Sequence, residues 1–106
     1  MAFEVVWHPS ASIDFDETID YVGQQFGWAA SKKLYDEVLE TVNRISAFPE
    51  IGVLSEGITY LGNEVRVFNI RQNSIVYAIG GTQITIIVFW NNRQNPVQLK
   101  TIVGSR

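Results

Sequence analysis

Cysteine is absent from this chain of 106 residues, and histidine occurs once, at His8. The lack of cysteine excludes disulfide bonds and thiolate metal sites. A zinc site would need carboxylates for most of its ligands, so we expect no metal and no other cofactor. The sequence also has no phosphate-cradling glycine loop, no GxSxG and no HExxH, and it therefore lacks the common signatures of nucleotide binding and hydrolysis.

Long apolar runs and early basic residues are missing as well. No run approaches the roughly 20 residues that cross a bilayer. The first basic residue is Lys32, whereas a signal peptide begins with a positively charged region. We therefore expect a cytoplasmic protein without membrane contact, folded as a single domain over residues 1–106.

Positive charge is scarce and unevenly distributed. Eight bases stand against eleven acids, and the net charge is −7 over residues 1–60 but +4 over residues 61–106. Because phosphate binding needs clustered lysine and arginine, this balance disfavours nucleic-acid binding by the whole domain. The basic second half can still attract an acidic protein partner, or the two halves can attract each other.

The first half of the chain predicts two amphipathic helices. Residues 2–7 form a first strand, and a helix with Ser10 as its N-cap follows. Its apolar residues recur at intervals of three and four until Gly27 ends the helix. A second helix runs from about Trp28 to Ala47, before Pro49. Helices joined so tightly form an antiparallel hairpin.

The last third predicts an antiparallel meander. Short runs rich in β-branched and aromatic residues are separated by tight polar turns, at residues 64–71, 73–79 and 83–90. Residues 49–63, with three glycines, predict a loop, and the tail after Pro96 predicts a strand or a helical turn. The order β-α-α-β-β-β indicates an α+β fold, with the helical hairpin on one face of a small, mainly antiparallel sheet whose other face is partly open. Because residues 84–90 are apolar on both faces, this strand is central or a partner covers its second face.

Several short motifs follow one another over nearly the whole chain. They are Asp20-Tyr21-Val22, Phe26-Gly27, Phe48-Pro49-Glu50-Ile51-Gly52, Val65-Arg66-Val67, Ile75-Val76-Tyr77-Ala78-Ile79 and Arg93-Gln94-Asn95-Pro96. With them the chain resembles the RelE/ParE superfamily of toxins from bacterial type II toxin–antitoxin systems. The resemblance implies a cognate antitoxin as partner, and it allows a heterotetramer with that antitoxin. RelE-like members cleave mRNA in the ribosome, whereas ParE-like members inhibit DNA gyrase.

The side chains needed for metal-free RNA cleavage are sparse here. This chemistry needs a base, an acid and several cations around the phosphate. Arg66 is the one arginine where RelE-like enzymes tend to carry several bases, and Ser74 stands where an arginine is expected. No late general acid follows Arg93, and Tyr77 is expected at the edge of the core. The resemblance therefore favours a ParE-like gyrase inhibitor. The alternatives are a ribosome-dependent mRNA endonuclease that uses Arg66 and Arg93, and a non-toxic remnant that acts only as an interaction module.

Two groups of residues are predicted to contact partners. The last strand carries amides and a guanidinium to one edge of the sheet, which predicts a target-binding site at Arg66, Trp90, Asn92 and Arg93. Each arginine can equally be a plain surface residue, and Asn92 can simply shape the turn before Pro96. Surplus apolar side chains on the second helix predict an antitoxin-binding surface at Trp28, Tyr35 and Leu39.

The other polar candidates favour structural roles. His8 lies at a strand-to-helix junction and is expected to be structural or exposed rather than catalytic. The acids of the first helix do not share one face, so they predict a solvated surface rather than a cation site; they are Asp14, Asp16, Glu17 and Asp20.

Overall fold

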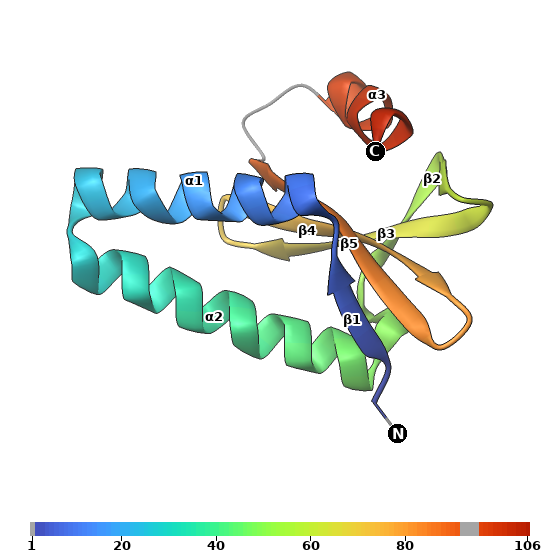
Figure 1. The fold of residues 1–106 in the computed structure, drawn as a ribbon, viewed down its shortest axis with the longest axis horizontal. Coiled ribbons are helices and arrows are strands. Elements are labelled where there is room, and N and C mark those ends of the chain that lie inside the picture. The colour runs from blue at the N-terminus through green and yellow to red at the C-terminus, as the bar shows by residue number, and fades with distance from the viewer. Residues whose placement is uncertain (1, 92–95) are drawn as a thin grey trace.

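The computed structural model describes residues 2–91 and 96–106, and Figure 1 shows their arrangement. Two long helices form a hairpin that covers one face of a five-stranded sheet, and a third helix lies apart from the hairpin. The elements in chain order are β1 (Glu4–Trp7), α1 (Pro9–Phe26), α2 (Trp28–Ala47), the 3-10 turn η1 (Pro49–Ile51), β2 (Val53–Tyr60), β3 (Asn63–Ile70), β4 (Asn73–Gly80), β5 (Gln83–Asn91) and α3 (Pro96–Ser105).

The strands lie in the order β1-β5-β4-β3-β2, with β1 parallel to β5 and the remaining neighbours antiparallel. This confirms the predicted α+β fold, but the predicted loop at residues 49–63 was wrong because it contains β2. The register of β2 against β3 shifts between Leu54 and Thr59, and Gly57 has a φ of +79°. That irregularity breaks the alternation of apolar and polar residues by which a strand is recognised.

The helical hairpin has the predicted bounds but a different N-cap. The backbone N–H of Ser10 donates to Nδ1 of His8 at 3.0 Å, so His8 caps α1 and the prediction of Ser10 as N-cap was wrong. Pro9 occupies the first helical position, where its missing N–H costs nothing. Gly27 links the two helices with a φ of +94°, which a residue with a Cβ rarely adopts.

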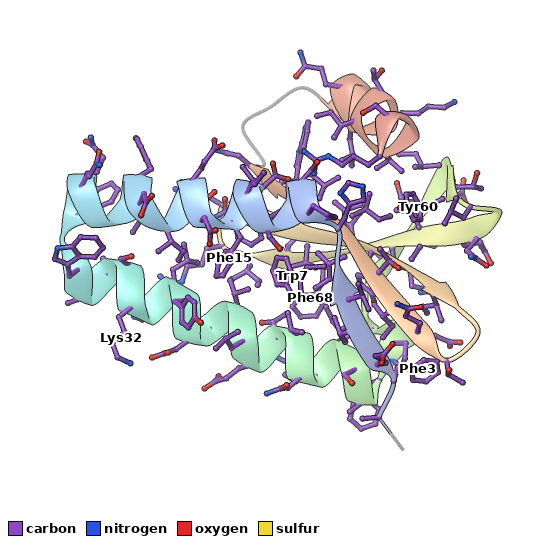
Figure 2. The ribbon with its side chains drawn as sticks, viewed as in Figure 1. Phe3, Trp7, Phe15, Lys32, Tyr60 and Phe68 are labelled. Atoms are coloured by element: carbon purple, nitrogen blue, oxygen red, sulfur yellow. The ribbon has the colours of Figure 1, made fainter. Side chains whose placement is uncertain are left out.

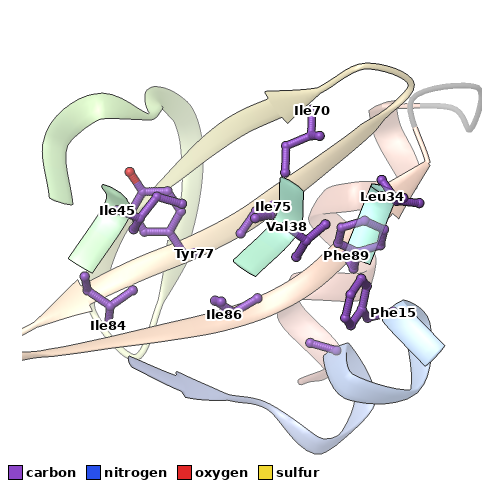
Figure 3. Close-up of a cluster of buried hydrophobic side chains, with 11 residues drawn as sticks. Phe15, Leu34, Val38, Ile45, Ile70, Ile75, Tyr77, Ile84, Ile86 and Phe89 are labelled. Atoms are coloured by element: carbon purple, nitrogen blue, oxygen red, sulfur yellow. The ribbon is translucent and has the colours of Figure 1, made fainter. Parts of the chain in front are cut away.

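The main hydrophobic core lies between the hairpin and the sheet (Figure 3). Phe15 of α1 packs edge-on against Phe89 of β5, with ring centroids 5.2 Å apart, and it also meets Trp7 of β1 at 5.4 Å. Figure 2 shows Trp7 and Phe15 in the space between the two helices. Burial of these side chains holds the hairpin to the sheet.

A second core lies on the opposite face of the sheet, beneath α3. Leu99 and Val103 of α3 pack there with buried residues of β3, β4 and β5. Val76 pairs with Val88 but Tyr77 pairs with Ile86, so Ile87 is an extra residue that forms a bulge in β5. Helix α3 of the same chain thus packs over part of the second face of β5. The strand is also central, between β1 and β4, as one of the two predicted explanations required.

Candidate functional site

Arg66 is tied to the protein's own backbone. It lies on β3 between Leu54 of β2 and Tyr77 of β4. Its Nη1 donates to the carbonyl oxygen of Gly52 at 2.9 Å and to that of Glu50 at 3.3 Å. The guanidinium therefore holds η1 and the start of β2 against the sheet, which limits its availability to an external phosphate.

Tyr77 is fully buried beside Arg66, which confirms that it is a core residue. Its hydroxyl donates to the Pro49 carbonyl at 2.5 Å and accepts from the Gly52 N–H at 2.9 Å. Burial raises the pKa of Tyr77, partly opposed by the Gly52 hydrogen bond and the charge of Arg66. A Cβ on Gly52 would lie 2.6 Å from the Tyr77 hydroxyl, so this position needs glycine for space rather than for its φ.

Trp90 of the predicted target-binding site is internal, and so is Ser74, which stands where RelE-like enzymes are expected to carry an arginine. Ser74 is buried, and its hydroxyl donates to Oδ1 of Asn69 at 2.5 Å. Trp90 is only 5% exposed in the second core, so its burial argues against the predicted contact with a target. The bulge at Ile87 turns Val88 and Trp90 toward α3. Asn92 and Arg93 lie outside the described residues, so their predicted proximity to Arg66 stays a prediction.

The predicted antitoxin-binding residues share one face of α2. Trp28, Tyr35 and Leu39 are seven and four residues apart, which places them in one helical stripe, and they are 71%, 45% and 42% exposed. The Trp28 indole lies over Gly23 of α1, where an added Cβ would come within 2.9 Å of the ring. Tyr35 stacks on Phe15 with centroids 5.7 Å apart. The stripe is thus an exposed apolar surface of the hairpin in which Trp28 and Tyr35 also contact residues of α1.

A second exposed apolar surface was not predicted from the sequence. Phe48, Ile51, Val53 and Leu54 are all exposed within seven residues after α2. Phe48 and Ile51 line an open hollow of about 510 Å³ together with Phe3 and Ile79. The sequence carries a signal for this surface, because four large apolar side chains lie in a segment that contains Pro49 and Gly52, but the glycines of residues 49–63 predict a loop.

Arg71 and Glu37 form a clasp between the β3–β4 turn and α2. Arg71 donates from Nε to Oε2 at 3.0 Å and from Nη2 to Oε1 at 2.8 Å. The Arg71 hydrogen bond lowers the pKa of Glu37, and the same bond raises the pKa of Arg71. Sequence patterns give no sign of this pair, because its members are 34 residues apart.

Neither a metal cluster nor a membrane-spanning helix is found among residues 2–91 and 96–106. These residues contain no group of three or more histidine, cysteine, aspartate or glutamate side chains that could hold a metal ion. None of their helices is both long and apolar enough to span a bilayer.

The architecture is an α+β domain in which a helical hairpin covers one face of a mainly antiparallel sheet. It is similar to a chain in the solved structure of the chromosomal ParDE TA system from P. aeruginosa, with a TM-score of 0.67. That match covers 85% of this chain and 96% of the other at 18% sequence identity, so the likeness concerns the fold.

The sequence itself gives the family. The family model for the ParE toxin of the type II toxin–antitoxin system, parDE, matches residues 5–96. The chain therefore belongs to the ParE toxin family, and the resemblance seen in its motifs is confirmed. No curated protein matches the sequence.

Proposed function

We propose that this chain inhibits DNA gyrase by binding it, without nuclease activity, and that a cognate antitoxin neutralises it by folding along its surface. The observation that carries the proposal is the engagement of Arg66 with the backbone carbonyls of Glu50 and Gly52. Cleavage of RNA without a metal needs cations free to stabilise the phosphate in the transition state. Tyr77 is buried beside Arg66, and Ser74 is buried further along β4, so this part of the sheet supports a structural role better than a catalytic one.

The apolar stripe on α2 supports the antitoxin half of the proposal. Trp28, Tyr35 and Leu39 leave apolar surface in water on a helix whose other apolar residues pack against the core. A disordered partner that folds on binding needs such surface to offset the cost of its own ordering. An amphipathic segment of the antitoxin laid along the hairpin would cover the stripe.

A supercoiling assay tests the gyrase half. Purified chain added to gyrase should abolish supercoiling, and an equimolar amount of the co-encoded antitoxin should restore it. Full gyrase activity at a large excess of the chain would remove the proposal. Primer extension on translated mRNA after induction provides the second arm, because cleavage at ribosomal positions that disappears in Arg93→Ala would favour a ribosome-dependent nuclease instead.

A further inference from the structure

The turn between β2 and β3 carries an apolar side chain in an unfavourable backbone conformation. Leu61 has a φ of +51°, and Gly62 after it has a φ of +82°. Positive φ at both central residues is typical of a type I′ turn, which favours Asn-Gly. A leucine in the left-handed region costs free energy, because its Cβ lies too close to the following carbonyl oxygen. The turn would therefore form more readily with asparagine, and its geometry does not explain the leucine.

Packing within the fold does not explain Leu61 either. In the described part of the chain only one other residue besides glycine has a positive φ, and it is Arg71. The fold uses that side chain, because its two hydrogen bonds to Glu37 hold the β3–β4 turn to α2. Leu61 is instead 84% exposed, more than any other large apolar residue that the structure describes. A strained residue whose side chain does so little for the fold points to a role in function.

The β2–β3 turn stands at one end of the molecule on a firm support. In Figure 1 it lies at the right, at the opposite end of the long axis from the link between α1 and α2. The two strands pair up to the turn, Thr59 with Glu64 and Tyr60 with Asn63. Tyr60 also packs against the second core. Because the base of the turn is fixed, little ordering is needed when Leu61 meets a partner.

The hairpin that carries Leu61 is acidic. Residues 53–65 contain two glutamates, Glu56 and Glu64, and no lysine or arginine. Both glutamates are exposed, and among the described residues neither forms an ion pair. Glu64 lies opposite Thr59, directly beside the turn. The complementary surface on a partner is an apolar pocket with basic side chains at its border.

We propose that Leu61 anchors this chain to its target, by insertion into an apolar pocket of DNA gyrase that is bordered by lysine or arginine. The inference rests on the gyrase inhibition proposed above and specifies which surface makes the contact. In the pocket the leucine side chain leaves water, and the Glu64 carboxylate pairs with a base at the border. A few side chains that enter pockets commonly carry most of the binding energy of an interface.

Substitution of Leu61 by asparagine separates stability from binding. Leu61→Asn should raise the melting temperature by about 2–5 °C, because asparagine suits this turn. The same variant should need at least about tenfold more protein to inhibit supercoiling by gyrase, because the apolar anchor is lost. Leu61→Met keeps an apolar side chain of similar volume and should inhibit within about threefold of wild type. Unfolding cannot explain a loss of inhibition in a variant that melts later than wild type.

Two control variants make the test specific to the tip of the hairpin. Phe48→Ser removes another exposed apolar side chain, in the segment after α2, and should change inhibition by no more than about twofold. Glu64→Lys should weaken inhibition about fivefold, through lost attraction and new repulsion at the border of the pocket. Glu17→Lys makes the same charge change at an exposed position of α1 and should stay within about twofold of wild type.

The outcomes separate this contact from gyrase inhibition itself. Wild-type inhibition by Leu61→Asn, or equal losses for Leu61→Asn and Phe48→Ser, would overturn the anchor while leaving gyrase inhibition intact. Equal inhibition by Glu64→Lys and Glu17→Lys would overturn the basic border of the pocket. A wild-type chain that does not inhibit gyrase at all would instead overturn the proposed function together with the anchor.

Discussion

Tyr77 and Arg66 of the sheet, together with Gly52, show how single residues fix the segment after α2. The buried hydroxyl of Tyr77 satisfies one donor and one acceptor of that segment, and Arg66 satisfies two more carbonyls. Gly52 leaves the space that the ring of Tyr77 needs. These hydrogen bonds fix the backbone of residues 49–52. They therefore also fix the positions of the exposed side chains of Phe48 and Val53 on either side.

Removal of the Tyr77 hydroxyl should lower the stability of the fold. Tyr77→Phe keeps the ring but leaves the Gly52 N–H and the Pro49 carbonyl without this partner, and we expect a loss of about 1–3 kcal/mol in the free energy of unfolding. Urea denaturation gives the value. Tyr21→Phe is the matched control, because Tyr21 is more than half exposed, and it should leave the stability unchanged. Equal midpoints for the two variants would contradict the role given to the hydroxyl.

The same residue predicts a change of stability in alkali. Burial raises the pKa of Tyr77 in the folded state, so folding favours the protonated phenol. The stability from this group is complete below its ordinary pKa of about 10 and is lost as the pH rises through the folded value. The difference in unfolding free energy between wild type and Tyr77→Phe should therefore shrink above that pH. A constant difference over the whole alkaline range would show that the phenol does not titrate with folding.

At the scale of elements, Asp14 and Arg106 complete the outer edge of β5. The strand β1 pairs with β5 only as far as Ile86. Beyond it, the Asp14 carboxylate accepts from the Phe89 N–H at 3.2 Å and Arg106 donates to the Ile87 carbonyl at 2.9 Å. The two side chains also pair with each other at 2.6 Å. An ion pair thus supplies hydrogen bonds that a neighbouring strand would otherwise make.

A double-mutant cycle measures the coupling free energy between Asp14 and Arg106. Asp14→Ala alone should cost about 2 kcal/mol, because it leaves a partly buried guanidinium and a backbone donor without their partner. Arg106→Ala in the Asp14→Ala background should cost much less than in wild type, since the two groups act together. The cycle of Lys32 and Asp36 is the comparison, and its coupling should be close to zero because that pair is exposed. Additive losses at Asp14 and Arg106 would contradict the coupling.

The elements that local patterns predict best are those that local contacts build. The spacing of apolar residues, with the helix-ending residues Gly27 and Pro49 on either side, predicted the bounds of α2 that the structure shows. In contrast, Asp14 was expected on a solvated face, and its partner lies 92 residues away. Trp90 was predicted to contact a target, but the bulge at Ile87 and the packing of α3 bury it. Pairings over such distances leave no mark in the spacing of neighbouring residues.

For the whole molecule, the proposed antitoxin should bind mainly by burial of apolar surface. Calorimetry at several temperatures should give a clearly negative heat-capacity change for association of the chain with its antitoxin. Added salt should weaken binding only modestly, through the basic second half of the chain. A negligible heat-capacity change, or an antitoxin already folded when free, would contradict a partner that folds along the hairpin.

The closed edge of β5 also bears on how copies of this chain behave at high concentration. Sheets grow into ribbons when one molecule offers a long straight edge to the next. Here one side of the sheet presents the four residues of β1 and then the paired side chains of Asp14 and Arg106. The other side presents β2, whose register shifts before Thr59. The paired side chains of Asp14 and Arg106 therefore limit strand addition along β5, and the register shift limits it along β2, so neither side offers a long template for fibres.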